Sequence, residues 1–128
     1  MVGNTSSSDA IFAMTAPREI ETTARERQGL AYGNANLQSA LEGLHQDGLL
    51  VLKGVVDVDH VDHLREVMSA ETKSILHDSE RAGLFNQGVK SNILQAPPVT
   101  QADCLFDDVY FNPYVIQLAN ACVYPDSH

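Results

Sequence analysis

The apolar residues between positions 36 and 77 follow two different spacings, and each spacing predicts a different element. After Asn36, a favourable N-cap, apolar residues recur every three or four positions and predict a helix that ends at Gly48. The continuous apolar run at residues 49–52 is typical of a strand covered on both faces. A second helix is expected over residues 57–77. This part of the chain therefore predicts a helix–strand–helix unit.

The second predicted helix carries negative charge at its start and one apolar stripe along its length. Asp57 or Asp59 would cap it, because a carboxylate accepts hydrogen bonds from the free N–H groups of a first turn. Six apolar residues at helical spacing should face the core: Val61, Leu64, Val67, Met68, Ile75 and Leu76. Four polar residues should point outward: His63, Arg65, Glu66 and Lys73.

The segments on either side are less regular. Residues 1–35 show no sustained apolar period, so we interpret them as a flexible leader with room for one short helix near residues 19–28. Residues 89–94 predict a strand, which two prolines end because proline cannot donate to a ladder. A last helix should start at Asn112-Pro113. Its apolar face would consist of Tyr114, Val115, Leu118, Ala119 and Cys122.

Composition narrows the class of protein. The 128 residues suit one domain, and 8 Lys and Arg against 17 Asp and Glu leave a formal charge of −9. This acidic balance argues against nucleic acid or an anionic membrane as a partner. No apolar run approaches the roughly 18 residues of a membrane span, and the first residues lack the basic start and the long apolar run that are typical of a signal peptide. The two cysteines, Cys104 and Cys122, form no disulfide framework. We therefore expect a soluble, cytoplasmic protein.

A family resemblance enters with the stretch LHQDGLLVLKGVV at residues 44–56. Its D-G pair, apolar run and second glycine resemble the opening of the phytanoyl-CoA dioxygenase family. Residues 61–67, with Leu and Arg on a helix, and the later stretches 85–95 and 106–113 are similar to the fungal members in the same order. The resemblance covers about residues 15–122.

The resemblance implies an α+β fold, namely the N-terminal helix–strand–helix part of a double-stranded β-helix (jelly-roll) oxygenase with an incomplete core. Residues 36–122 are then the N-terminal part of such a domain, and residues 123–128 an aberrant C-terminal end. The family hydroxylates small molecules, in fungi within specialised metabolism, with Fe(II) and 2-oxoglutarate as cofactors. It holds iron with an H-x-D pair and a distal His, and 2-oxoglutarate with an Arg, beyond the region matched here. We expect this truncated chain to bind neither cofactor and to be inactive.

Two H-x-D triplets do occur, and the first lies in the second predicted helix. In His60-Val61-Asp62, helical geometry points the first and third side chains about 200° apart, so they cannot share a metal. His63 is correctly spaced from His60 or from Asp59, but the sequence identifies no third ligand. We therefore assign no metal-binding or catalytic residue.

The second triplet, His45-Gln46-Asp47, lies at a helix end, where the two side chains could converge as the helix unwinds. A self-sufficient minimal oxygenase would take His45, Asp47 and His128 as iron ligands. The simpler interpretation, which we adopt, is an exposed histidine and a turn-forming aspartate before a glycine.

Three residues are candidates for cofactor binding: Lys90, Asn92 and Gln95. In related oxygenases this segment runs near the co-substrate pocket, whereas the alternative is an edge strand with alternating polar residues. Cys104 and Cys122 have no activating His or Lys nearby in the sequence, so nothing indicates a nucleophilic thiol.

A function of another class is a non-catalytic interaction module. A strand at residues 49–52 or 93–94 without the rest of its sheet would present an open edge that pairs with another chain. Under this hypothesis the partner is a second copy of the chain or a full-length relative.

Overall fold

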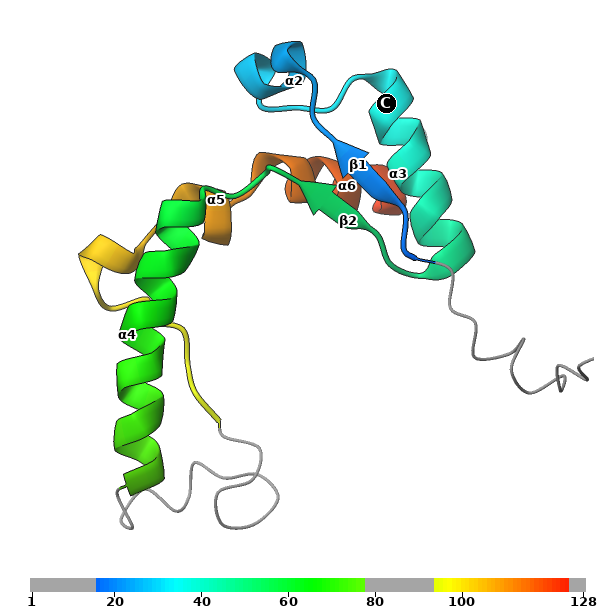
Figure 1. Cartoon of the computed structure of the whole chain (residues 1–128). Helices are drawn as coiled ribbons and strands as arrows, with labels where there is room; N and C mark the ends of the chain where they lie inside the picture. The colour runs from blue at the N-terminus through cyan, green and yellow to red at the C-terminus, as the bar shows by residue number, and fades with distance from the viewer. Residues whose placement is uncertain (1–15, 78–93, 125–128) are drawn as a thin grey trace, which may run out of the picture. The chain divides into compact units, whose positions relative to one another are not determined.

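The computed structural model describes residues 16–77 and 94–124. The elements are strand β1 (Glu19–Glu21), helices α2 (Ala24–Gly29) and α3 (Asn34–Asp47), strand β2 (Val51–Lys53), helix α4 (Val58–His77), the 3-10 turn η2 (Ala102–Cys104), and helices α5 (Asp107–Tyr110) and α6 (Pro113–Val123) (Figure 1). Helices combined with a small sheet make an α+β arrangement, as expected. The chain divides into two compact units: the first unit is Met1–Lys53 with Gln117–His128, and the second unit is Gly54–Ile116.

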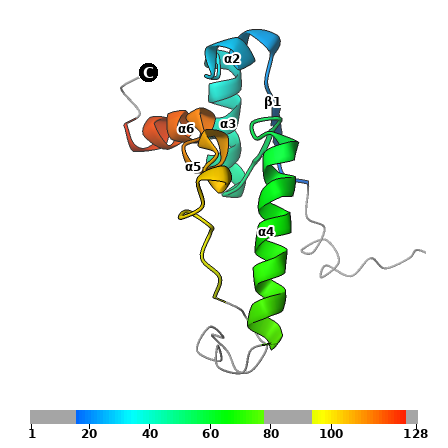
Figure 2. The ribbon, with the colours of Figure 1, turned by 90° about the vertical axis from the view of Figure 1, so that its left-hand side faces the viewer.

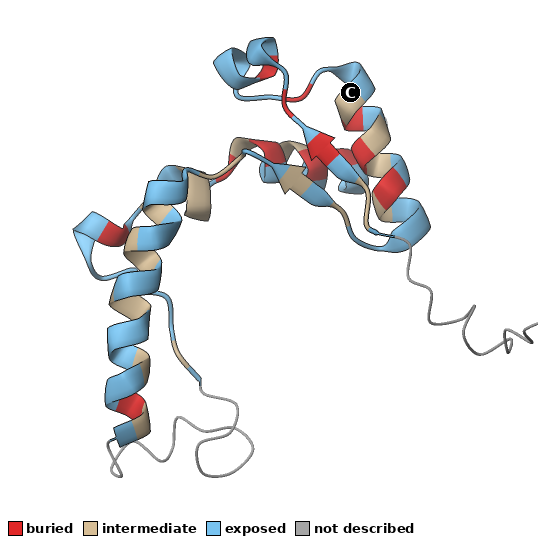
Figure 3. Cartoon of the chain, viewed as in Figure 1, coloured by how far each residue is buried: buried red, intermediate tan, exposed pale blue. Residues whose placement is uncertain are grey.

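The first unit is built on a parallel pair of strands. β1 and β2 lie side by side, with Ile20 opposite Leu52 in the register (Figure 1). A parallel pair needs a long crossover connection, and α2 and α3 provide it. The buried apolar side chains of this unit come from β1, α3, the C-terminal half of α6 (Figure 3) and the segment between α2 and α3, and they include Ile20, Leu37, Ala40, Leu118, Ala121 and Tyr32.

Helix α3 ends as predicted but begins differently. Gly48 adopts φ of 74°, a left-handed conformation that glycine tolerates, and its N–H donates to the Leu44 carbonyl over 2.9 Å. The predicted N-cap, Asn36, lies inside the helix, which Gly33 caps instead. The Asn36 amide donates to the Glu21 carbonyl and to the Glu26 carboxylate, at 3.0 and 2.8 Å. A tertiary role therefore replaces the predicted capping role.

Strand β2 is less covered than the sequence predicted. The strand covers Val51–Lys53, and both Leu49 and Val51 are exposed, at 50 % and 39 %. Alternate residues of a strand face opposite sides, so Ile20 and Leu52 share the packed face while Val51 lies on the other. Within the described residues the sheet has two strands, and its second face is exposed. Coverage on both faces is therefore a wrong prediction for this chain.

The segment interpreted as a leader contains regular structure from residue 19. β1 and α2 both lie before residue 36, and α2 is shorter than the helix expected near residues 19–28. Thr23 and Glu26 form a capping box at the start of α2. The T-x-x-E spacing that encodes this box is visible in the sequence and was the available signal.

In the second unit, α4 begins at one of the two predicted caps. The Asp59 N–H donates to Asp57 Oδ1 over 2.9 Å, so Asp57 is the capping residue. Ile75 is buried as predicted, at 1 % exposure, whereas Val61 is 49 % exposed and was wrongly placed in the core. Residues 94–101 run beside α4 in both ribbon views (Figures 1 and 2).

Helix α6 begins where the sequence predicted but presents another face. Asn112 Oδ1 accepts hydrogen bonds from the N–H groups of Tyr114 and Val115, at 3.1 and 3.2 Å. Three predicted core residues are exposed, namely Val115, Ala119 and Cys122. The buried residues are Tyr114, Leu118 and Ala121. The Gln117 amide explains the rotation of the C-terminal half, because it pairs with the backbone N–H and carbonyl of Tyr32 at 2.7 and 3.0 Å.

Two predicted segments lie largely beyond the described residues. The strand predicted at residues 89–94 falls outside them except for Leu94, which belongs to no strand. The C-terminal end at 123–128 is described only for Val123 and Tyr124. Among the helices that the structure describes, none combines the length and the apolar character needed to cross a membrane.

Candidate functional site

The structure describes one of the three candidate cofactor-binding residues. Lys90 and Asn92 lie outside the described residues. The Gln95 amide donates to the Met68 carbonyl and to the Glu71 carboxylate, both at 2.9 Å, and accepts from Thr72 Oγ1 at 2.8 Å. Both ends of this amide thus bind helix α4 and hold residues 94–98 against it.

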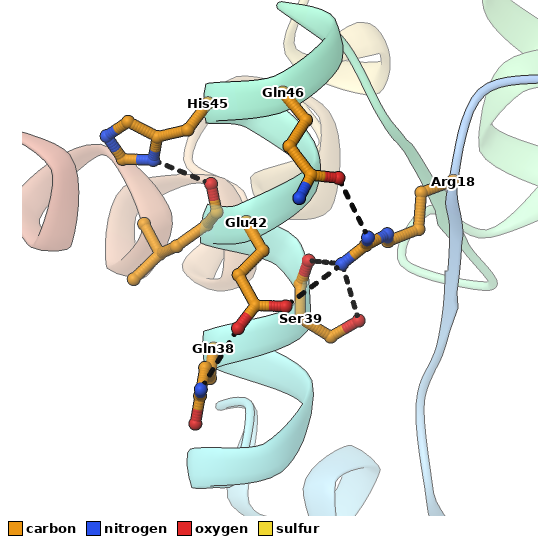
Figure 4. A network of polar contacts seen from close by, with 7 residues as sticks. Arg18, Gln38, Ser39, Glu42, His45 and Gln46 are labelled. Atoms are coloured by element: carbon orange, nitrogen blue, oxygen red, sulfur yellow. Dashed lines mark hydrogen bonds and ion pairs between the residues drawn. The ribbon is translucent and has the colours of Figure 1, made fainter.

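The His45-Gln46-Asp47 triplet lies at the end of α3. His45 Nδ1 contacts the Leu41 carbonyl at 2.7 Å, and the histidine points away from the Arg18 contacts on the other side of the helix (Figure 4). The Asp47 side chain is exposed, and the third ligand of a minimal oxygenase, His128, lies outside the described residues. The structure therefore describes two of these three residues, and an iron site that needs His128 falls outside the described residues.

Arg18 joins the chain before β1 to α3. Its guanidinium donates to the Ser39 carbonyl at 2.8 Å, to Glu42 Oε2 at 3.4 Å and to Gln46 Oε1 at 3.3 Å (Figure 4). A guanidinium bound by several groups of a neighbouring helix in this way positions that helix against the chain before β1. Both terminal nitrogens of Arg18 therefore already contact groups of α3.

In the other triplet, His60 and Asp62 have different partners. Asp62 pairs with Arg65 on its own helix at 3.2 Å. His60 Nδ1 contacts both carboxylate oxygens of Asp108, at 2.8 and 3.0 Å. Neither triplet in the described residues converges on a distal histidine, so these residues do not fit the iron set that the family resemblance implies.

The structure instead assembles a cluster between α4 and the η2–α5 segment. His60 and His63 lie one turn apart on α4, and His63 Nε2 contacts Asp103 Oδ2 at 3.0 Å. Phe106 stacks on His60, with ring centroids 4.0 Å apart, and meets His63 edge-on at 6.0 Å. His63, predicted to point outward, is therefore half-buried against Asp103.

Asp108 is held ionised by its surroundings. Burial raises the pKa of this carboxyl, but hydrogen bonds from the Asp57 N–H and from His60 outweigh burial and lower the pKa overall. The Asp57 N–H donates to Asp108 Oδ2 over 2.7 Å. Asp57 is the cap of α4, so Asp108 links the start of α4 to α5.

Cys104 completes the cluster as a buried thiol. Its side chain has 0 % exposure, and burial, together with the negative charge of Asp103, raises the pKa of the thiol. A thiol in this environment stays protonated at neutral pH, which does not suit a nucleophile. The donor atoms of His63, Asp103 and Cys104 all lie within 4.8 Å of one another.

Sequence reasoning recognised His60 and His63 as correctly spaced but found no partner for them. The partners are 48 and 40 residues away along the chain, on the η2–α5 segment. The available signal was the acidic and thiol content of the stretch A-D-C-L-F-D-D at residues 102–108. Its proximity to α4 could be learned only from the tertiary structure.

Comparison with known proteins adds no family to these observations. The chain matches no protein-family model, and no solved structure matches it.

Proposed function

We propose that this chain is the N-terminal part of an Fe(II)- and 2-oxoglutarate-dependent oxygenase of the phytanoyl-CoA dioxygenase type. The whole enzyme would hydroxylate a small molecule, and specialised metabolism in a fungus is the setting that the resemblance implies. In this proposal the residues described here supply structure, and a jelly-roll core encoded elsewhere supplies the iron and co-substrate ligands.

The observation that carries the proposal is the parallel pair β1–β2. Its strands have three residues each, and Val51 in β2 and Leu49 just before it are exposed. Parallel strands are generally covered on both faces and belong to larger sheets, because a two-stranded sheet has little stability of its own. A pair this short favours a chain whose sheet is extended by further strands.

The local geometry of residues 44–56, on which the family resemblance rests, supports the same proposal. The D-G pair forms the left-handed end of α3, the apolar run leads into β2, and α4 follows with an aspartate cap. This is the helix–strand–helix order on which the resemblance rests.

Sequencing the transcript across the codon for His128 tests the proposal. We expect a frame or splice form that continues into a strand bearing H-x-D, followed by a distal His and an Arg. The longer product should consume 2-oxoglutarate in the presence of Fe(II), and the present chain should not. If no form of the message encodes such a continuation, the oxygenase proposal fails.

The present chain also provides a direct control. Anaerobic titration with Fe(II) and 2-oxoglutarate should give no metal-to-ligand charge-transfer band. A band that is lost in His45→Ala and in Asp47→Asn would favour the minimal oxygenase with His45, Asp47 and His128 as ligands, and would contradict our assignment of the iron site to a separate core.

A second candidate function is the interaction module, in which the open sheet pairs with another chain. The same exposed residues, Leu49 and Val51, favour it, since an uncovered apolar strand is a template for pairing. The two functions differ in the strands that complete the sheet: those of one longer chain, or those of a second molecule.

A further inference from the structure

Part of the cluster between α4 and η2 offers a nitrogen, an oxygen and a sulfur as possible metal ligands, and neither proposed function uses them. His63 offers a ring nitrogen, Asp103 a carboxylate oxygen and Cys104 a sulfur, and all three lie within 4.8 Å of one another. They come from two segments that are 40 residues apart along the chain. The cluster is therefore a product of folding and not of a local sequence motif.

Each donor is held by the local backbone or by a neighbour. The 3-10 turn Ala102–Cys104 carries two of the donors on consecutive residues, and the Cys104 N–H bonds the Gln101 carbonyl at 3.0 Å. The edge-on contact with Phe106 restrains the imidazole of His63. Pre-set donors reduce the ordering that binding of an ion would otherwise require.

The burial of Cys104 beside a carboxylate also needs an explanation. An apolar residue of similar size would fill the same space without placing a weak acid next to Asp103. The thiol lies at 0 % exposure, whereas the Asp103 side chain is 68 % exposed and that of His63 is 39 % exposed. An ion could thus approach from the solvent side and meet the sulfur at the closed end of the cluster.

We propose that His63, Asp103 and Cys104 form a binding site for a divalent transition-metal ion with the preferences of zinc. Nitrogen and sulfur donors favour zinc over magnesium or calcium, which prefer oxygen ligands alone. Zinc lies about 2.0–2.3 Å from such donors, so tetrahedral donors are roughly 3.3–3.8 Å apart. Small side-chain rotations would bring the three donors from their present separations to these values.

A bound ion would place positive charge beside the Cys104 thiol and so favour its deprotonated form. A coordinated thiol is deprotonated, so binding should release the Cys104 proton that burial now retains. Three protein ligands leave a fourth position for water. The site would join α4 to η2, and it does not depend on the oxygenase proposal, because iron would be held by a different set of residues.

Titration of the full chain with Co(II), without oxygen and with a reductant that lacks thiols, tests the proposal. We expect one Co(II) per chain and a thiolate-to-cobalt charge-transfer band in the near ultraviolet. Zn(II) should displace the cobalt and release one proton from Cys104 per ion. The absence of a thiolate band would overturn the proposal. So would a band that excess Mg(II) abolishes, or one that is lost with Cys122 and not with Cys104.

The chain offers matched controls. Cys104→Ser should abolish the band, and Cys122→Ser, which changes the exposed thiol, should leave it intact. His63→Gln and Asp103→Asn alter half-buried and exposed side chains, so they should fold normally and weaken cobalt binding at least tenfold. His45→Gln is the matched histidine control. Unchanged affinity in correctly folded His63→Gln and Asp103→Asn would refute the site even if Cys104→Ser did not fold.

Discussion

At the residue scale, one carboxylate organises the turn between α2 and α3. Glu26 accepts hydrogen bonds from the N–H groups of Thr23 and Gly33, at 2.8 and 2.7 Å, and from the Asn36 amide at 2.8 Å. Burial raises the pKa of Glu26, but these hydrogen bonds outweigh burial and lower the pKa overall. A single side chain thus satisfies donors on both sides of the turn.

Glu26→Gln should therefore destabilise the protein at neutral pH. Glutamine presents an amide NH2 to groups that are themselves donors, and hydrogen bonds to a charged acceptor are the stronger ones, so we expect a loss of about 2 kcal/mol in the free energy of unfolding. Urea denaturation at pH 7 measures it. The exposed Glu21→Gln is the control, and a loss equal to that of Glu26→Gln would contradict this role.

The same substitution has a defined pH dependence. Because the folded pKa of Glu26 lies below its ordinary value of 4.5, the stabilisation is fully present above that pH and is lost as the pH falls through the folded pKa. The difference between wild type and Glu26→Gln should shrink in acid. An equal difference at pH 7 and in acid would argue against an ionised Glu26 as its source.

At the scale of elements, the short helix α5 depends on its contact with α4. Asp108 accepts from the Asp57 N–H and from His60, while Asn112, just after α5, donates to the carbonyls of Val55 and Asp108 at 2.8 Å each. A helix of four residues is too short to be stable by itself. These polar contacts, together with the stacking of Phe106 on His60, hold α5 in place.

Asp108→Asn should loosen this contact by about 1 kcal/mol in the free energy of unfolding, because the charge is lost while one acceptor oxygen remains. The pKa of Asp108 is lowered from 3.8, so the wild-type advantage is present above that pH and declines as the pH falls through the folded pKa. Chemical denaturation at neutral and acidic pH measures the loss of stability and its pH dependence. Amide exchange at the Asp57 N–H reports on the contact itself. The adjacent, exposed Asp107→Asn should change neither, and equal effects of the two variants would contradict the assignment.

At the scale of the whole molecule, segments distant in sequence build each compact unit. Gln117 and Leu118, near the end of the chain, belong to the same unit as β1 and α3, and the second unit brings η2 to α4. The exposed Val51 is the first residue of β2, in the short parallel pair of the first unit. If an open sheet is completed by a second molecule, this residue lies at or near the contact.

The interaction-module hypothesis predicts a measurable change in assembly. The chain should self-associate with increasing concentration, and Val51→Lys should shift it toward monomer, since a charge on an exposed strand opposes pairing. Light scattering across a concentration series measures this. The control is Val99→Lys, which changes another exposed valine, outside the sheet, and should not alter self-association. A monodisperse monomer with cooperative unfolding at every concentration would contradict the hypothesis.

Local patterns in the sequence were sufficient to predict where several elements begin and end. The end of α3 at Gly48, an aspartate cap of α4 at Asp57 or Asp59, and the start of α6 after Asn112 follow from short-range hydrogen bonding and backbone freedom, which adjacent residues determine. The structure selected Asp57 as the cap. The capping box of α2 was equally local, although the prediction missed it.

Only the tertiary structure decided which faces of these elements are buried and which polar groups meet. The rotation of α6 follows from Gln117 pairing with Tyr32, 85 residues away. Asn36 does not cap α3 as predicted, and its amide binds the Glu26 carboxylate. The meeting of His63 with Asp103 and Cys104 likewise depends on η2 packing against α4. Periodicity in a sequence shows that a helix has an apolar side, but contacts between distant segments select the side that is used.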